Sequence, residues 1–468
     1  MNINPFRGTM VIGTPGSGKS FGVINPAIRQ MIGKGFCLCI YDFKFPDLAQ
    51  IAYYHYLLKK SKNKGYQHQF HVINLNDVEK SKRVNPFRKE YIQTLAEAQE
   101  MAESMVSSLQ KGGSSSGGGS DAFFTQSAIN FLSSCIYFFA RLENGKYSDL
   151  PHILSFMNRS YKEIFDALFT NEEILSLLSP FKTAYDNKAF DQLEGQIGTL
   201  KIFMSRLATK ESFWVFSDDE VELKITDREN PSILILASDP GTQDINSALY
   251  SSVLNRTLRL INSKHNLPGG IIADEFPTIY IHKIDNVVAT ARSNRVAVLL
   301  GLQEIPQPRQ FYKKEVADTI SAIVGNILSG SARDKNTLDW LEKLFGKIKQ
   351  KSYSQSISQQ GTTTSINEKM DNMIPAGKIA ALKTGEMVGI IAQGEENDTE
   401  EYKTSAMNGK INLDLKAIKH EEQNYVKMPV YYSFADKTGK DRKDEVLMTN
   451  FRKINKEVEL IVNELSKE

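Results

Sequence analysis

The chain has 468 residues, of which 41% are hydrophobic and 24% are charged, a globular composition that suits about two or three domains or one large core with an insertion. Its formal net charge of +2 excludes an overall polycation, so any contact with nucleic acid must use local patches. Basic clusters occur at 59–64, 80–83 and 347–351, and each alone is best explained as a solvated loop. No apolar run approaches the ~20 residues that span a bilayer, and no signal peptide precedes Asn2, so we expect a soluble chain.

A phosphate-binding motif lies almost at the first residue. Gly13-Thr14-Pro15-Gly16-Ser17-Gly18-Lys19-Ser20 has the spacing G-x-x-x-x-G-K-[ST]. Residues 8–13 predict a buried strand before it and residues 21–32 a helix after it, which is the context that the motif requires. The glycines allow the backbone N–H groups to surround a polyphosphate, and the helix N-terminus favours its charge. We expect Lys19 to neutralise the β- and γ-phosphates of ATP and the Ser20 hydroxyl to ligate Mg²⁺.

The next predicted strand, 36–41, carries two of the three cysteines. Cys37 and Cys39 alternate, so they share one strand face and should be buried, and with Cys135 they form neither a metal spacing nor an even disulfide set. This pattern favours a reducing, cytosolic setting. Asp42 and Lys44 close the strand at the edge where ligands gather in such sheets. Their role is open, and a simple ion pair is the alternative.

The order of predicted elements indicates an α/β core with an inserted segment. Strands at 8–13, 36–41 and 70–75 alternate with helices, which predicts a parallel sheet covered by helices. From 89 to 210 helical periodicity replaces the strand-like runs, which predicts an all-α inserted domain. Inside it, Gly112 to Ser120 contains only glycine and serine, so we expect a mobile loop, whether natural or an engineered linker.

After the helical segment the α/β pattern resumes. The predicted strands are 232–237, 270–274, 296–302, 325–329 and 387–392, and the intervening helices are 245–263, 284–293, 314–322 and 334–345. Polar residues 349–367 predict a hairpin or loop, Lys427–Phe434 a strand-like run, and Asn450–Leu465 a final helix. The predicted domains are therefore a first core part at 1–88, the all-α insert at 89–210, a second core part at 211–405 and a C-terminal extension at 406–468.

Acidic and polar residues at two strand ends complete a candidate nucleotide site. The buried strand 269–273 ends in Asp274 and Glu275, which fit an acid that helps to hold Mg²⁺ and an acid that polarises the attacking water. Gln303 ends the next strand, where it could sense the γ-phosphate or orient water, and an ordinary loop glutamine is the alternative. Arg292 ends the helix between these strands and acts either as an arginine finger in a neighbouring subunit or as a helix C-terminal charge.

These residues resemble the coupling-protein ATPases of type IV secretion and conjugation, the TraG/VirD4 group, and in particular the TraG-like mobilisation proteins of Bacteroidetes. The resemblance covers roughly residues 4–400, and the runs 274–278 and 289–294 carry it most specifically. The matching stretches are Asn4-Pro5-Phe6-Arg7-Gly8, Tyr41-Asp42-Phe43-Lys44, Gln192-Leu193-Glu194-Gly195-Gln196, Asp274-Glu275-Phe276-Pro277-Thr278, Ala289-Thr290-Ala291-Arg292-Ser293-Asn294 and Ile374-Pro375-Ala376-Gly377-Lys378-Ile379.

The resemblance implies a RecA-like P-loop NTPase with a mostly parallel sheet interrupted by an all-α domain. It further implies a homo-hexameric ring at the cytoplasmic face of the bacterial inner membrane, which uses ATP and Mg²⁺ to drive relaxase-bound DNA, single-stranded and bound without sequence preference, into a secretion channel. In such a ring Lys19 and Ser20 bind phosphate and Mg²⁺, Asp274 and Glu275 serve hydrolysis, and Gln303 and Arg292 assist.

Two further expectations concern the anchor and the cargo. Members of this family usually begin with transmembrane helices, so we expect the motor to be the soluble part of a longer protein whose anchor is absent from this chain. A short form that lacks an anchor is the alternative. The alternatives to DNA translocation are a motor of the same fold that recruits proteins and an adaptor that binds ATP only to assemble.

Overall fold

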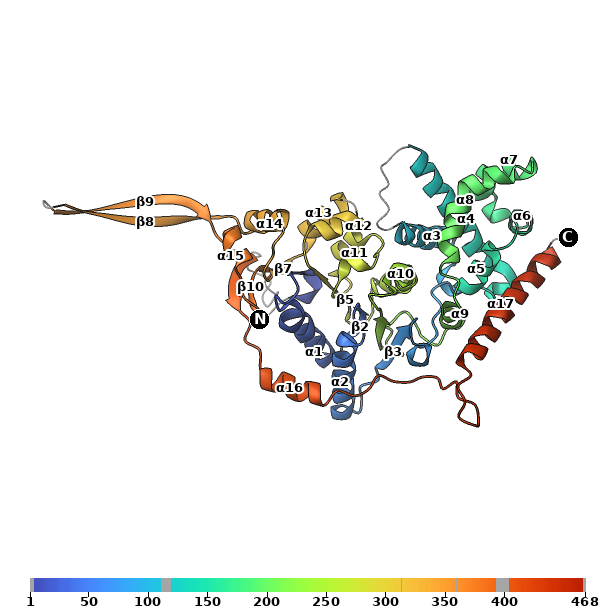
Figure 1. The fold of residues 1–468 in the computed structure, drawn as a ribbon, viewed down its shortest axis with the longest axis horizontal. Helices are drawn as coiled ribbons and strands as arrows, with labels where there is room; N and C mark the ends of the chain where they lie inside the picture. Colours follow the sequence, from blue (N-terminus) through green and yellow to red (C-terminus); the bar gives the residue numbers. More distant parts are fainter. Residues whose placement is uncertain (1–3, 111–118, 313, 359–360, 393–403, 466–468) are drawn as a thin grey trace.

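The computed structural model describes residues 4–110, 119–312, 314–358, 361–392 and 404–465. These residues form a nine-stranded sheet in the order β11-β10-β7-β1-β6-β5-β2-β4-β3 (Figure 1). Strands β1 to β7 pair in parallel, whereas β10 pairs antiparallel with both β7 and β11, so the predicted, mostly parallel sheet is confirmed. The strands are β1 Thr9–Ile12, β2 Cys37–Asp42, β3 Gln69–Asn74, β4 Ser232–Ala237, β5 Gly269–Ala273, β6 Val296–Leu302, β7 Asn326–Ser329, β10 Glu386–Ala392 and β11 Thr404–Lys410.

The central strands read as continuous apolar runs because helices cover both faces of the sheet. Cys37 and Cys39 of β2 are buried in one hydrophobic cluster, and Leu38 and Ile40 are buried in the other, so the predicted shared face of the two cysteines is confirmed. Helices α1 (Asn25–Gly33) and α2 (Asp47–Lys62) pack in the second cluster. The helices that pack in the first include α10 Gln243–Ile261, α11 Ile284–Ala291, α12 Pro306–Tyr312, α13 Lys314–Ile323 and α14 Lys335–Phe345.

A block of helices lies between β3 and β4, at the right of Figure 1. It contains α3 Leu95–Leu109, α4 Gly119–Arg141, α5 Leu150–Met157, α6 Tyr161–Leu168, α7 Leu175–Asp186, α8 Phe190–Ser205 and α9 Lys210–Phe216. Thr94 begins the block with a capping box, because its side chain accepts from the N–H of Glu97 while the Glu97 carboxylate accepts from the N–H of Thr94. Of the predicted Gly/Ser loop, residues 112–118 lie outside the described residues, and Gly119 and Ser120 begin α4. The domain limits at 88, 210 and 405 stay a prediction.

The chain after α14 leaves the sheet and returns to it. Strands β8 (Lys347–Ser358) and β9 (Gly361–Asn372) pair antiparallel in a ribbon that projects from the body in Figure 1, so the predicted hairpin is confirmed. Helix α15 (Ala376–Ala380) then leads into β10. Helix α16 (Leu415–Gln423) docks on the sheet-covering helices through Glu421, whose carboxylate lies 3.0 Å from the Arg29 guanidinium and 3.2 Å from the His55 imidazole.

The predicted strand at Lys427–Phe434 is wrong. This segment is extended but joins no ladder, because its backbone contacts a loop rather than a strand edge: the N–H groups of Tyr431 and Tyr432 both donate to the carbonyl of Glu79, at 2.8 and 3.2 Å. The final helix, α17 (Lys443–Leu465), begins earlier than predicted and packs on α5, α6 and α9. Within the described parts of the chain, no helix has the length and apolar character that crossing a membrane requires.

Candidate nucleotide site

The phosphate-loop sequence forms the turn that the motif predicts, with one difference after it. Gly16 and Gly18 have φ angles of +83° and +92°, a region that residues with a Cβ avoid. The Ser17 hydroxyl is buried without a hydrogen-bond partner, so a polar group inside the turn is available to a ligand. The predicted helix at 21–32 starts instead with a π-helical turn at Ser20–Ile24 that continues into α1. Such turns are rare and are frequently found at functional sites.

Two segments far along the chain hold the loop in place. The N–H of Thr14 donates to the carbonyl of Ser331 at 3.0 Å, just after β7, which lies beside β1. On the other side, the Thr384 hydroxyl donates to the carbonyl of Gly16 at 2.9 Å, and the N–H of Gly385 donates to the carbonyl of Ser17 at 3.1 Å. The turn before β10 therefore borders the phosphate loop. The sequence motif missed this contact because no local pattern shows which strand lies next to β1.

The ends of β1 and β5 bring four predicted residues together. The Lys19 ammonium donates to the carbonyl of Asp274 at 2.9 Å and lies 3.3 Å from its carboxylate and 3.7 Å from that of Glu275. The Ser20 hydroxyl donates to the Asp274 carboxylate at 3.1 Å. This cluster of one cation, one hydroxyl and two carboxylates lies at the carboxyl edge of the parallel strands, where ligands bind in such sheets.

Glu275 has the environment of a candidate base. Burial raises the pKa of its carboxyl, whereas Lys19 and a hydrogen bond from Gln303 act in the opposite direction. The Gln303 amide lies 3.4 Å from the Glu275 carboxylate. The structure therefore places Gln303 beside the acid pair, at the end of β6.

Arg292 lies at the other edge of the sheet. It follows α11 and precedes β6, and the carbonyl of Arg295 accepts a hydrogen bond from the N–H of Gly269, the first residue of β5. The amino ends of the parallel strands meet at that edge, whereas the phosphate loop follows the carboxyl end of β1. The fold therefore does not bring Arg292 to the Lys19 cluster of its own chain.

Asp42 serves as a helix cap. Its carboxylate accepts hydrogen bonds from the N–H groups of Leu48 and Ala49, at 3.0 and 2.9 Å, in the first turn of α2. Burial raises its pKa to about 7, while those two hydrogen bonds lower it. Among the described residues no ion pair joins Asp42 to Lys44, so the ion-pair alternative is wrong.

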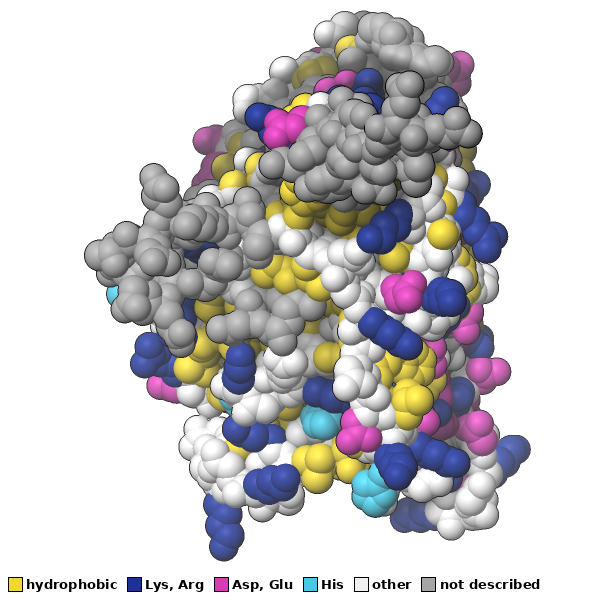
Figure 2. All heavy atoms as spheres, turned by 90° about the vertical axis from the view of Figure 1, so that its left-hand side faces the viewer, with side chains coloured by type: hydrophobic (Ala, Val, Ile, Leu, Met, Phe, Trp, Pro, Cys, Tyr) yellow, Lys and Arg dark blue, Asp and Glu magenta, His cyan; other side chains and the backbone are white. Residues whose placement is uncertain are grey.

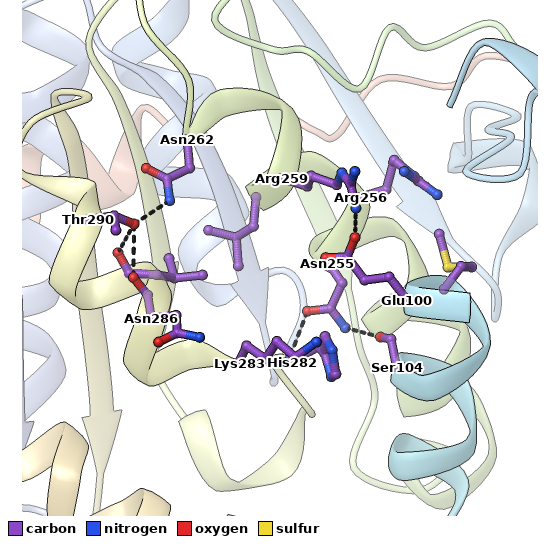
Figure 3. Close-up of a pocket in the computed structure, with 13 residues that line it drawn as sticks. Glu100, Ser104, Asn255, Arg256, Arg259, Asn262, His282, Lys283, Asn286 and Thr290 are labelled. Carbon is purple, nitrogen blue, oxygen red and sulfur yellow. Dashed lines mark hydrogen bonds and ion pairs between the residues drawn. The ribbon is translucent and has the colours of Figure 1, made fainter. Parts of the chain in front are cut away.

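A separate cavity of about 270 Å³ lies between α3, α10 and α11 (Figure 3). Its polar side chains largely pair with one another: the Asn255 amide donates to the Ser104 hydroxyl at 2.7 Å, and the Arg259 guanidinium pairs with Glu97 at 3.1 Å and with Glu100. None of the predicted site residues lines it. These pairs join the first helix of the inserted block to the helices of the sheet core.

Comparison with known proteins gives one family and one fold. A family model described as the DNA-binding domain of type IV secretion-system coupling proteins matches residues 5–394. The conjugative coupling protein TrwBdeltaN70 in an unbound form is similar in structure, with a TM-score of 0.63 and 14% identity over 87% of this chain and 86% of that one. TrwB with ADP and Mg²⁺ (TM-score 0.61, 13% identity) and TrwB with the non-hydrolysable ATP analogue ADPNP (0.63, 14%) match over the same shares. No curated protein matches the sequence. At these identities the structural matches show the fold alone, and they confirm the predicted RecA-like P-loop NTPase class.

Proposed function

Because the chain belongs to the type IV secretion-system coupling-protein family, we propose that it hydrolyses ATP to drive relaxase-bound DNA into a secretion channel. The observation that carries the proposal is the cluster of Lys19 and Ser20 with Asp274 and Glu275. A phosphate loop alone occurs in many nucleotide-binding proteins. The acid pair within reach of its lysine and serine is what hydrolysis requires in addition.

The residues of the loop fit ATP and Mg²⁺, as in the TrwB complexes with ADP and Mg²⁺ and with ADPNP. Gly13 to Ser20 would surround the phosphates, and Lys19 would turn from the two carboxylates toward them. Ser20 and Asp274, already in contact, would hold Mg²⁺, which supplies charge neutralisation at the phosphate oxygens. Within the described residues no cluster of three His, Cys, Asp or Glu side chains forms a separate metal site.

In the proposed reaction Glu275 accepts a proton from, or polarises, the attacking water, and Gln303 orients it. The raised pKa of Glu275 brings its basicity closer to neutral pH, which favours general-base catalysis. Arg292 is distant from this site within one chain, so its proposed role is to complete the site of a neighbouring subunit in a homo-hexamer. The proposed setting is the cytoplasmic face of the inner membrane.

The described surface constrains how DNA would bind. Lys80 pairs with Asp77 at 2.8 Å, Lys82 with Glu220 at 3.3 Å and Arg83 with Asp218 at 2.6 Å, so the 80–83 cluster is largely neutralised within the chain. On the face seen in Figure 2, Lys and Arg side chains are dispersed among acidic and apolar ones. The phosphates of the DNA would therefore contact basic side chains from several subunits of a ring.

The test is the rate of ATP hydrolysis with and without single-stranded DNA. We expect DNA to stimulate the wild type, and we expect Glu275→Gln to lower the stimulated rate by a factor on the order of 100 while ATP-analogue binding persists. Glu315→Gln removes an exposed acid outside the site and serves as the matched control. Normal DNA-stimulated ATP hydrolysis by Glu275→Gln would refute the role of Glu275 in activating the attacking water.

Two further outcomes separate the alternatives. A translocase that follows the DNA backbone must lose affinity steeply as salt rises, because each phosphate contact releases counterions. No binding at low salt would favour protein cargo instead. An assembled wild-type ring without turnover would favour an adaptor that uses ATP only to assemble.

A further inference from the structure

Three hydroxyl groups form a chain beside the acid pair, at the carboxyl edge of three adjacent strands. Ser238 follows β4, Tyr41 is the penultimate residue of β2, and Thr278 ends a single 3-10 turn, Phe276–Thr278, after β5. The Tyr41 phenol lies 3.2 Å from the Ser238 hydroxyl and 3.2 Å from the Thr278 hydroxyl. The chain ends on Glu275, because the Thr278 hydroxyl donates to the backbone carbonyl of Glu275 at 2.7 Å.

Thr278 fixes the backbone that carries the Glu275 carboxylate. Both its hydroxyl and its N–H, the latter at 3.0 Å, donate to the same carbonyl of Glu275. A threonine hydroxyl bonded three residues back is a common local arrangement, and by itself it would show only a stable turn. The contact with Tyr41 is different, because it joins the turn to another strand.

Tyr41 is rigidly placed and uncharged. Its side chain is fully buried, and its ring meets the ring of Tyr250 edge to face, with centroids 6.4 Å apart. Burial raises the pKa of its phenol, so the proton stays in place at neutral pH. A buried phenol without partners is destabilising, and the hydroxyls of Ser238 and Thr278 satisfy this one.

Ser238, at the other end of the chain, is buried and held by its backbone. Its N–H donates to the carbonyl of Asp42 at 2.9 Å, and its carbonyl accepts from the N–H of Phe45 at 3.2 Å. Tyr41 therefore contacts a fixed hydroxyl on one side and the 276–278 turn on the other.

We propose that Thr278 and Tyr41 are positioning residues for Glu275, and that the Ser238–Tyr41–Thr278 chain holds the backbone of Glu275 in the place that hydrolysis requires. The inference rests on the proposed ATPase function and adds to it the residues that position its base. A double-mutant cycle measures whether the two side chains act together.

The experiment measures kcat and KM for ATP, with and without single-stranded DNA, in Thr278→Val, Thr278→Ser and Tyr41→Phe. Thr278→Val keeps the shape and removes the hydroxyl, so we expect kcat to fall about tenfold while KM changes less than about twofold. Thr278→Ser keeps the hydroxyl and should return kcat to within about twofold of wild type. If Thr278 had only a structural role, Thr278→Val would change KM and thermal stability together, and Thr278→Ser would not restore kcat selectively.

Tyr41→Phe tests the contact between β2 and the 276–278 turn. We expect it to lower kcat by a factor of about three to ten and to change KM less than about twofold. The double variant with Thr278→Val should be no slower than Thr278→Val alone, because both interrupt the same chain. A wild-type kcat in Tyr41→Phe overturns the proposal even if Thr278→Val fails to fold, and so does simple multiplication of the two effects. A wild type without turnover refutes the proposed function as well, whereas active wild type with unaffected variants refutes the chain alone.

Discussion

Alanine at Gly18 and at Gly16 should weaken nucleotide binding to different degrees. Both glycines have positive φ, so each alanine costs about 1–2 kcal/mol of backbone strain. A Cβ on Gly18 would also lie 3.0 Å from the N and 3.4 Å from the Cα of Gly385, whereas a Cβ on Gly16 would meet no heavy atom within 4 Å. The atoms of Gly385 that the new methyl group would meet belong to the backbone and cannot rotate away, so overpacking adds about 1–3 kcal/mol to the cost of Gly18→Ala.

The strain appears as lost affinity because the nucleotide requires the loop in its present shape. Without nucleotide an alanine variant relaxes by shifting the loop away from Gly385, and binding must reverse that shift. At about 1.4 kcal/mol per factor of ten, Gly16→Ala should weaken binding about tenfold and Gly18→Ala about a hundredfold or more. Equilibrium titration with a fluorescent ATP analogue and Mg²⁺ measures both values, and thermal unfolding checks that each variant is folded. Equal losses in the two variants would show that Gly385 does not restrict the loop and would refute the reasoning.

Three further predictions concern charge. Burial places the pKa of Asp42 near 7, above its ordinary 3.8, so the folded state holds this proton more tightly than the unfolded state does. The stability of the protein should therefore fall as the pH rises from about 4 to 7. Asp42→Asn should remove this pH dependence, which is measured as the thermal midpoints of both proteins at pH 5.5 and 8. Gln303→Ala removes a hydrogen bond that lowers the pKa of Glu275, so the acid limb of the kcat–pH profile should move to higher pH, and a shift to lower pH would contradict the contact. If Arg292 acts on a neighbouring subunit, mixing the inactive variants Arg292→Ala and Lys19→Ala should restore part of the ATPase rate. Normal activity of an Arg292→Ala ring would instead show that Arg292 is only a charge at the end of a helix.

The sequence predicts the parts of this fold whose causes are local. Strands β1, β2 and β5 are apolar on both faces, so a continuous hydrophobic run with a turn signal after it identifies them. The proximity of Lys19 and Asp274 could be predicted from the sequence, because the loops that follow parallel strands lie at one edge of the sheet. In the structure the Lys19 ammonium lies 3.3 Å from the Asp274 carboxylate.

What the sequence could not show depends on distant pairing. Nothing near Gly18 indicates that Gly385, more than three hundred residues later, borders it, since that contact follows from β7 lying between β1 and β10. The run at Lys427–Phe434 has strand-like residues and lies near the edge strand β3, yet the N–H groups of Tyr431 and Tyr432 bond to Glu79 rather than to that strand. Side-chain alternation indicates half-burial, and only the tertiary structure decides whether a partner strand is present.

The contacts of Lys19 also suggest why nucleotide binding would activate this site. The Lys19 ammonium lies 3.7 Å from the Glu275 carboxylate and opposes the increase in pKa that burial causes. When Lys19 turns to the phosphates, this opposition weakens while the carboxyl stays buried. The phosphate charges would add to the increase in pKa, whereas Mg²⁺ would counteract it. Lys19 would thus tie the basicity of Glu275 to the occupancy of the phosphate loop.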